Sequence, residues 1–355
     1  MRRMLVGLAV AIATFAGGGF GGLVGVAGAA PIACGTQLMA STVLQADVGP
    51  CATDHGLGIY ADNVVLDLNG HKVFGTAERR EDIGIFVAAR NGAVVRNGTV
   101  TGFRDGVYAA SSSNTTITGM TVVDNIGVTE GSHAGAGIVV SLGDNNAVIR
   151  SIVRHNGPTA GIQVAMATRT RIEGNVIVGN NIARSGIGGH GEILGNDDMG
   201  IYIVSGPLGL RGRAEDNQIL DNIVRGNGSH GLVTTAGSDR TIVRGNDFSR
   251  NGNNQHPLLP DAEGIWVKSS HNRVTGNNVM SNSGSGIRVT PRYAIVDGQT
   301  LPVDGLDNRM EGNLAVGNGH GPYFGVDLVD DVPNCDDNIW SGNVFVTAVP
   351  ECAAG

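Results

Sequence analysis

Lysine and aromatic residues are scarce in this chain of 355 residues. Lys72 and Lys268 are its only lysines, and phenylalanine, tryptophan and tyrosine together make up 4% of the sequence. The formal net charge is −8 at pH 7. An acidic chain with almost no lysine lacks the broad basic surface that neutralises a phosphate backbone, so we expect no nucleic-acid partner.

Long apolar runs and amphipathic helices are also missing. No segment repeats its apolar residues at the helical period, and the apolar run near the N-terminus is broken by glycines before it reaches membrane-spanning length. That run follows two arginines and ends in small residues at Ala29, which is the pattern of a secretory signal peptide. We predict a signal peptide over residues 1–29, a mature domain over residues 30–355 without a membrane span, and a location in the cell envelope or outside the cell.

Cysteine is rare too, with four residues placed as two pairs. Cys34 and Cys51 lie near the start of the predicted domain, and Cys335 and Cys352 lie near its end. The sequence has no Cys-x-x-Cys spacing, which would indicate a metal site. In an oxidising compartment such residues form disulfides, and three connectivities are open. We expect pairing within each end, because each bridge would then staple one end of the fold.

What the chain has in abundance is glycine, with 57 residues, and many of these belong to a recurring phrase. The phrase is a glycine, an aliphatic residue, a variable residue and another small or aliphatic residue. It begins at Gly84, Gly137, Gly161, Gly200, Gly264 and Gly286, with looser copies at Gly106, Gly231 and Gly325. A second phrase, Asn-x-aliphatic-x-Gly-Asn, follows most copies. Because one unit is too small to bury its own apolar face, the units must stack on one another.

Side-chain direction shows what kind of stack this is. Along an extended strand the two aliphatic residues of each phrase face one way and the variable residue faces the other. Stacked in register, the aliphatic columns fill a continuous interior, and the strands of successive turns run parallel about 4.8 Å apart. Turn asparagines such as Asn175, Asn246, Asn277, Asn313 and Asn343 suit a left-handed backbone position and can form a hydrogen-bonded ladder.

These features resemble the pectin-lyase-like superfamily of right-handed parallel β-helix proteins. Leu66-Asp67-Leu68-Asn69-Gly70-His71 and the repeated Asn-Gly-x-x-Gly-Ile phrases carry the resemblance over nearly all of the predicted domain. It implies an all-β fold, a single-stranded right-handed parallel β-helix (solenoid) of roughly ten rungs with disulfide-stapled ends. The superfamily includes lyases, hydrolases, epimerases, phage tail spikes and accessory proteins of copper-enzyme maturation, so the fold does not choose a function.

Four consecutive rungs are predicted to present a cluster of reactive side chains outward. The cluster contains Asp197, Asp198, Tyr202, His230, Glu263, Trp266, Lys268 and Arg288. Four rungs span about 15 Å, the length of a few sugar units. The largest insertions flank the same rungs, and long loops beside a regular scaffold are where binding sites are usually built. We therefore predict a polysaccharide site on this face. Phe86 and Tyr108 lie outside it, and we expect each to pack against a loop.

The side chains suggest how an acidic polysaccharide would be cleaved. Tyr202 and Trp266 offer flat apolar faces to sugar rings. In a lyase, Lys268 or Arg288 would serve as the base or stabilise the developing negative charge, and we would then expect Ca²⁺ dependence.

Carboxylates in the same cluster suggest a hydrolase or a metal site instead. In a hydrolase, Asp198 and a second acid would carry the activity, because paired carboxylates act as acid and base when their surroundings separate their pKa values. Asp197, Asp198 and Glu263 could instead hold Ca²⁺ through their oxygens. No other cofactor is indicated.

The order of three phrases resembles the polygalacturonase-type hydrolases. That family has an Asp-Asp, a His-Gly and an Arg-Ile-Lys phrase on successive rungs, and Asn196-Asp197-Asp198, Ser229-His230-Gly231-Leu232 and Gly264-Ile265-Trp266-Val267-Lys268 stand in that order here. The resemblance implies a catalytic role for the acids and for His230. This sequence departs from the pattern at Trp266, which replaces the arginine, and it has no Asn-Thr-Asp phrase upstream.

Two non-catalytic interpretations fit the same residues. The protein could be an extracellular or envelope β-helix that binds glycans or serves as a structural rod, or a periplasmic accessory protein of a copper enzyme. Asp, His and Ser are common in the tight turns before β-helix strands, so some charged residues of the cluster could be turn residues. The sequence does not determine the sugar, its linkage or the oligomeric state.

Overall fold

The computed structural model describes residues 31–76, 82–126, 135–180, 199–206, 212–252, 262–296, 299–320, 325–335 and 337–355. Residues 32–355 form one compact unit. The predicted signal peptide, residues 1–29, lies outside the described residues. In the part of the chain that is described, no helix is long and apolar enough to cross a membrane.

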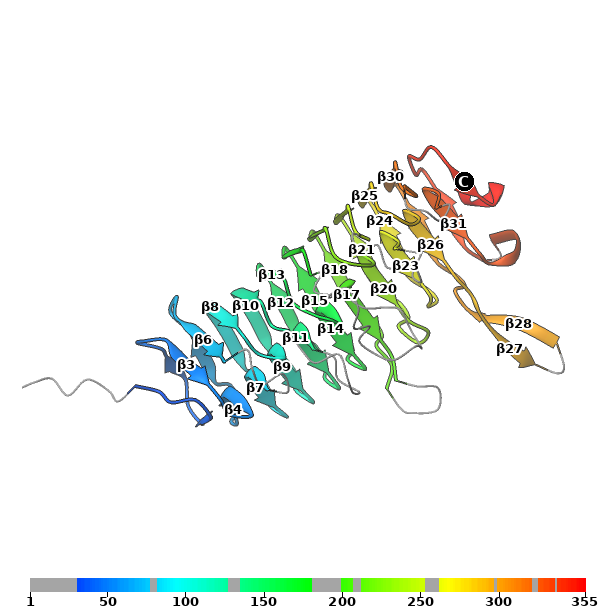
Figure 1. The fold of residues 1–355 in the computed structure, drawn as a ribbon. Helices are drawn as coiled ribbons and strands as arrows, with labels where there is room; N and C mark the ends of the chain where they lie inside the picture. The colour runs from blue at the N-terminus through cyan, green and yellow to red at the C-terminus, as the bar shows by residue number, and fades with distance from the viewer. Residues whose placement is uncertain are drawn as a thin grey trace, which may run out of the picture. The chain divides into compact units, whose positions relative to one another are not determined.

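One long parallel sheet, called sheet A below, runs along this unit (Figure 1). Each phrase supplies one strand, which pairs with the strand of the next rung. The twelve strands are, in spatial order, β1 (Thr36–Leu38), β4 (His55–Ile59), β7 (Ile83–Ala88), β9 (Asp105–Ala110), β11 (Ala136–Ser141), β14 (Ala160–Ala165), β17 (Met199–Val204), β20 (Leu232–Thr234), β23 (Ile265–Val267), β26 (Ile287–Val289), β31 (Leu328–Asp330) and β33 (Ala348–Val349).

Two further series of parallel strands close each rung, and the long strands β8 (Val94–Thr101) and β10 (Thr116–Val123) belong to both. The first series adds β2 (Thr42–Val43), β5 (Val65–Asp67), β12 (Ala147–Ile149), β15 (Arg171–Glu173), β18 (Gln218–Leu220), β21 (Ile242–Arg244), β24 (Arg273–Thr275), β29 (Arg309–Glu311) and β32 (Ile339–Ser341). The second adds β3 (Val48–Cys51), β6 (Lys72–Gly75), β13 (Ile152–Arg154), β16 (Val176–Val178), β19 (Ile223–Arg225), β22 (Asp247–Ser249), β25 (Asn278–Met280) and β30 (Leu314–Val316).

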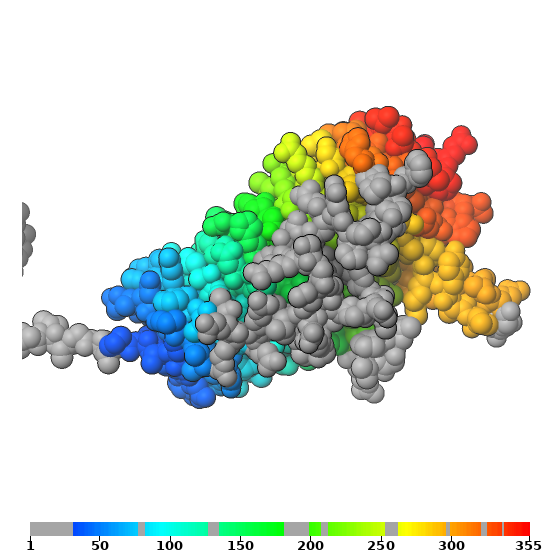
Figure 2. Space-filling view, in the orientation of Figure 1, coloured from blue at the N-terminus to red at the C-terminus, as the bar shows by residue number. Residues whose placement is uncertain are grey.

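A hairpin and two short 3-10 helices interrupt this regularity. Strands β27 (Arg292–Val296) and β28 (Gln299–Asp304) form an antiparallel hairpin between β26 and β29. The hairpin projects away from the stacked strands (Figures 1 and 2). The helices η1 (Pro333–Cys335) and η2 (Glu351–Ala354) lie at the C-terminal end. The predicted single-stranded right-handed parallel β-helix is confirmed.

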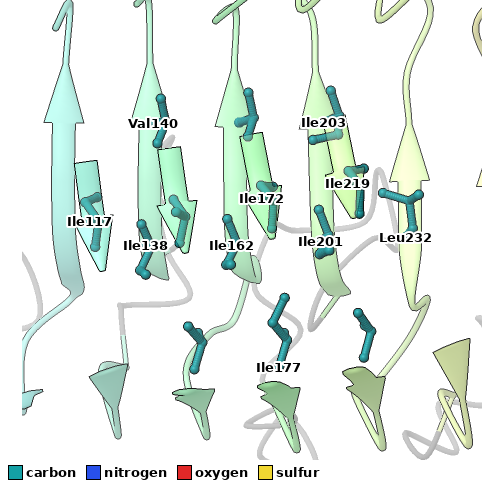
Figure 3. Close-up of a cluster of buried hydrophobic side chains, with 14 of the residues drawn as sticks. Ile117, Ile138, Val140, Ile162, Ile172, Ile177, Ile201, Ile203, Ile219 and Leu232 are labelled. Carbon is teal, nitrogen blue, oxygen red and sulfur yellow. The ribbon is translucent and has the colours of Figure 1, made fainter. Parts of the chain in front are cut away.

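Aliphatic columns fill the interior, as the alternation predicted. Ile138, Ile162 and Ile201 are partners on adjacent sheet A strands, and each is 0% exposed. Ile172 and Ile219 from the first series point into the same interior (Figure 3). Burying one such side chain contributes about 1.5–3 kcal/mol, so the stacked columns are the main source of stability.

The recurring glycine is explained by close packing between rungs. A Cβ atom on Gly264 would lie 2.8 Å from the carbonyl oxygen of Gly286 and 2.6 Å from the amide nitrogen of Asn282. Both distances are too short for a carbon atom. The next rung and a ladder asparagine therefore occupy the space that any larger residue would need.

The asparagine ladder is confirmed, but its backbone conformation differs from the prediction. Asn277 donates its backbone N–H to the Oδ1 of Asn313 (3.0 Å) and its side-chain amide to the carbonyl of Val243 (2.9 Å). Its own Oδ1 accepts from the backbone N–H of Asn246 (2.9 Å). The left-handed residue is the preceding Gly276, with φ +60°. The prediction that the ladder asparagine takes this conformation was wrong, because glycine makes the turn while the asparagine side chain points inward.

Both predicted local disulfides are present. Cys34 pairs with Cys51, and Cys335 pairs with Cys352, each across 17 residues. Cys51 and Cys335 are buried at the two ends of the core. The pairing therefore holds the terminal segments against the first and last rungs.

Removing the N-terminal disulfide is expected to lower the free energy of unfolding. Closing a loop of this size is worth about 3 kcal/mol in the chain-entropy model, so the Cys34→Ala/Cys51→Ala variant should melt at a clearly lower temperature. Circular dichroism of the oxidised wild type and the variant measures this. An unchanged melting temperature would show that the first rung needs no staple.

The ladder makes a second prediction about stability. Asn277→Ala removes the four side-chain contacts of Asn277 with Asn246, Val243 and Asn313 and leaves the buried backbone N–H of Asn246 without its acceptor, which should cost about 3 kcal/mol. The neighbouring exposed residue provides the control, because Asn278→Ala changes the same residue type on the outer surface of β25. Denaturant unfolding of both variants tests the difference. Equal midpoints would contradict a structural role for the ladder.

Candidate functional site

The candidate site lies on the outer face of sheet A, where four strands place their variable residues in one column. Tyr202 on β17 is the register partner of Val233 on β20, which is the partner of Trp266 on β23. Trp266 is in turn the partner of Arg288 on β26. Lys268 follows Trp266 by two residues, so it emerges on the same side of the sheet. The stacking predicted from the glycine phrase thus brings these side chains together.

A buried histidine and glutamate form the base of the site. His230 and Glu263 each precede a phrase glycine on adjacent rungs, and the histidine Nδ1 lies 2.7 Å from the glutamate Oε2. Their side chains are 1% and 0% exposed. The same Nδ1 lies 3.0 Å from the backbone nitrogen of Glu263. The two contacts compete, since the carboxylate needs a proton on Nδ1 and the backbone N–H needs its lone pair. A hydrogen on Nδ1 allows the first contact, and an Nδ1 without a hydrogen allows the second.

Arg288 connects this pair to the edge of the site. Its Nη1 lies 3.2 Å from the Oε1 of Glu263, and its Nε lies 2.7 Å from the Oδ2 of Asp331. Burial opposes ionisation of Glu263, but the hydrogen bond and charge of His230 and the charge of Arg288 outweigh it and hold the pKa of Glu263 below its usual value. Glu263 is therefore an anion at neutral pH.

Lys268 is the unusual cation of the site. Its Nζ lies 3.2 Å from the centroid of the Trp266 ring, a cation–π contact. Burial against this ring, together with the charge of Arg288, lowers the pKa of Lys268 to about 8, although the charge of Glu263 acts in the opposite direction. Lys268 can therefore lose its proton close to physiological pH.

Trp266 is held from several sides. Its indole N–H donates to the Oγ1 of Thr290 (2.8 Å), and its ring centroid lies 5.0 Å from that of His230. Because Lys268 covers one face of the indole ring, a sugar ring could stack only on the part of the Trp266 side chain that remains exposed. The stacking role predicted for Trp266 remains a proposal.

Tyr202 belongs to the apolar part of the site. Together with Trp266 it packs against a small outer cluster of Ala160, Met199 and Val233. Burial raises the pKa of the Tyr202 phenol, so this hydroxyl stays protonated at neutral pH. The cluster gives the face an apolar floor next to its charged end.

The structure thus brings together five of the eight predicted site residues in direct contact. These are His230, Glu263, Trp266, Lys268 and Arg288. Tyr202 lies two rungs from Trp266, with Val233 between them. Asp197 and Asp198 lie outside the described residues, so the acid pair and the Ca²⁺ site predicted from them remain predictions.

Asp331 is the site residue that the sequence did not reveal. The last repeat was placed at Gly325, but Arg288 pairs with Val329, which puts Asp327 where the glycine was expected. That placement was wrong by two residues, because the Asp327 carboxylate ends an asparagine ladder by accepting from the backbone and amide N–H groups of Asn318 (3.0 Å each). With the corrected register, Asp331 follows Val329 by two residues and meets Arg288. In this register Asp330 also stands where the phrase has its second aliphatic residue, so neither the glycine nor the aliphatic residues of the phrase could have located Asp331.

Comparisons with solved structures identify the same fold in other proteins. The Dettilon tailspike protein (gp208) is similar with a TM-score of 0.53 at 15% identity, over 89% of this chain and 59% of that chain. The periplasmic alginate epimerase AlgG gives 0.55 at 11% identity, over 82% of this chain and 70% of that chain. This chain spans less than two thirds of the tailspike chain. At such identities the likeness shows the fold alone.

Comparison with family models is more specific. No curated protein matches the sequence. Residues 192–323 match a model described as the right handed beta helix region. Residues 68–257, more than half of the chain, match the family described as periplasmic copper-binding protein (NosD), and the chain therefore belongs to that family.

Proposed function

We propose that this protein is a secreted or cell-envelope polysaccharide lyase that cleaves an acidic polysaccharide on the outer face of sheet A, with Lys268 as the base. The observation that carries the proposal is the Lys268 amine, placed over Trp266 with a pKa of about 8 and subject to the opposing charges of Glu263 and Arg288. A partly buried lysine whose pKa lies near the working pH is what base catalysis requires. The two disulfides and the description of the family as periplasmic support the location.

The proposed reaction is a β-elimination on a uronate residue. The neutral amine of Lys268 takes the proton from the carbon next to the carboxylate, and the electron pair of that C–H bond becomes a carbon–carbon double bond. The glycosidic C–O bond breaks, and the leaving oxygen keeps its electron pair and takes a proton from the lysine ammonium or from solvent. No oxidant, reductant or water molecule is consumed.

The surrounding groups support this chemistry through their charges. As Lys268 takes the proton it becomes a cation, which offsets the negative charge that develops on the substrate carboxylate. Arg288 adds a second positive charge on the same face, while its bonds to Glu263 and Asp331 hold the guanidinium in place. Glu263 raises the pKa of Lys268 and so keeps the lysine able to hold the transferred proton.

The described carboxylates fit a hydrolase less well. A glycoside hydrolase needs one carboxylic acid that stays protonated near neutral pH. The pKa of Glu263 is held low, and the carboxylate is enclosed by His230 and Arg288. Among the described site residues, Glu263 therefore does not suit this role.

Copper binding, which the family description suggests, finds no cluster of histidine, cysteine or acidic ligands in the described part of the chain. Copper sites use histidine, cysteine and methionine ligands brought together. All four cysteines are in disulfides, and the described residues contain no group of three or more histidine, cysteine or acidic side chains that could hold a metal ion. His230 is engaged with Glu263.

The second candidate function is therefore a non-catalytic, glycan-binding or accessory β-helix, consistent with the family assignment. The observation that favours it is that Glu263, Arg288 and Asp331 satisfy one another in an ion-paired chain. These two ion pairs could serve only to hold the neighbouring rungs together. Binding of a polysaccharide without any cleavage product would favour this candidate over the lyase.

The lyase is tested with polygalacturonate and alginate, the latter because the epimerase of similar fold is named for it. We expect unsaturated products, detected by their ultraviolet absorbance, with activity that rises up to about pH 8 and then levels off as Lys268 loses its proton. Lys268→Met should lower the rate at least about a hundredfold, whereas the control Lys72→Met should not. New reducing ends without unsaturation would instead identify a hydrolase and overturn the proposed step.

The state of Lys268 can be measured directly, because the chain has only two lysines. Brief acetylation at a series of pH values, followed by peptide mass spectrometry, should give a labelling midpoint near pH 8 for Lys268. In Glu263→Gln the midpoint should move to lower pH, because the negative charge that favours the ammonium is gone. A midpoint at the ordinary value of 10.5 would mean that Lys268 is not the base.

A further inference from the structure

A second group of aromatic rings lies in the same outward column of sheet A, nearer its N-terminal end. Phe86 on β7 and Tyr108 on β9 are register partners, and their ring centroids lie 5.9 Å apart with the planes at 62°. The column continues through Val139 and Gln163 to Tyr202. The sequence-based expectation treated Phe86 and Tyr108 as single residues packed on loops, whereas the two rings contact each other.

Two more rings extend this group by one rung. Gly58 on β4 is the register partner of Phe86, and a Cβ atom there would collide with the Tyr60 ring and lie 3.0 Å from the Nε2 of His55. The rings of Tyr60 and His55 therefore occupy the space above the glycine. Their centroids each lie 6.5 Å from that of Phe86. His55, Tyr60, Phe86 and Tyr108 are called the aromatic platform below.

The platform is a concentration of a rare residue type on one surface. Only 4% of the chain is aromatic, and the inward positions of the same strands are filled by aliphatic residues. All four rings of the platform are partly exposed. The Nε2 of His55 is a buried polar atom without a hydrogen-bond partner among the described residues. Packing alone explains neither the choice of flat rings at partly exposed positions nor this unpaired nitrogen.

We propose that the aromatic platform is a distal subsite that stacks the sugar rings of the same polysaccharide chain that Lys268 cleaves; the inference rests on the proposed function for its substrate class. Aromatic rings in binding sites offer a flat apolar face together with polar edges, which suits a pyranose ring with its hydroxyl groups.

The geometry of the rungs sets the length of chain that can reach both places. Tyr108 and Tyr202 are three rungs apart, or about 14 Å, and Phe86 and Trp266 are six rungs apart, or about 29 Å. Val139 and Gln163 lie between the two aromatic groups in the same column. An extended polysaccharide following this column would contact the platform at one end and the cleavage site at the other.

The test measures the affinity for long chains of polygalacturonate and alginate by calorimetry, in a Lys268→Met background so that the ligand is not consumed. Phe86→Leu/Tyr108→Leu keeps apolar volume but removes the flat faces, and it should weaken binding about tenfold. Gly58→Ala leaves all four rings in the sequence but displaces Tyr60, and it should weaken binding in the same direction. The matched control is Tyr293→Leu, an exposed tyrosine on the β27–β28 hairpin, which should bind like the parent.

The outcomes separate this inference from the proposed function. The Lys268→Met protein is the parent of this series. If the parent, both platform variants and the control bind with equal affinity, or if the parent binds neither polysaccharide, the platform is overturned. If the wild type makes unsaturated products but the platform variants bind normally, the lyase stands and the platform falls. If binding depends on Phe86 and Tyr108 but the wild type forms no unsaturated product, the aromatic platform stands as a binding site and the lyase falls. Melting temperatures of the variants confirm that each is folded.

Discussion

The in-register stacking of rungs is the constraint on which the whole structure depends. Each strand of sheet A pairs with its counterpart one turn later, so a residue acquires neighbours by its place in the repeat and not by its distance along the chain. The close approach of Gly264 to the next rung, and the asparagine ladder beside it, leave no room for a shifted register. A slip of one residue would turn every aliphatic column toward solvent.

The same constraint creates the charged site. His230, Glu263 and Lys268 come from two rungs, and Arg288 comes from a third. Stacking brings these side chains together whether or not their charges attract. Ion pairing therefore has to offset the free-energy cost of removing the charges from water. Glu263 achieves this through His230 and Arg288, whereas Lys268 relies on the face of Trp266. The difference explains why the glutamate stays ionised while the lysine is close to losing its proton.

Outside the site, the outer surface of the same sheet combines two kinds of recognition. Charged side chains gather on and beside β20, β23 and β26, and aromatic rings gather on and beside β4, β7 and β9. Both sets occupy equivalent positions of the repeat. A regular scaffold can thus present unlike chemical groups along one line at spacings that are multiples of the strand separation.

Much of the candidate site could be predicted because the phrase glycine acts as a ruler. Counting from it placed His230, Glu263, Trp266, Lys268 and Arg288 on one face, and each of them is in contact with another. Asp331 escaped because its rung has Asp327 in place of the glycine, where a carboxylate ends the ladder. Pairings such as Phe86 with Tyr60 and His55 also escaped, because they depend on how side chains fill the space above Gly58.

The amino-acid sequence by itself determined the stack and most of its outward columns, since both follow from a periodic pattern of glycine, aliphatic residues and asparagine. Only the tertiary structure decided which charges are buried and which carboxylate pairs with which cation. Burial, proton affinity and ring stacking arise from atoms that meet across rungs, and a linear pattern carries no measure of how closely they approach.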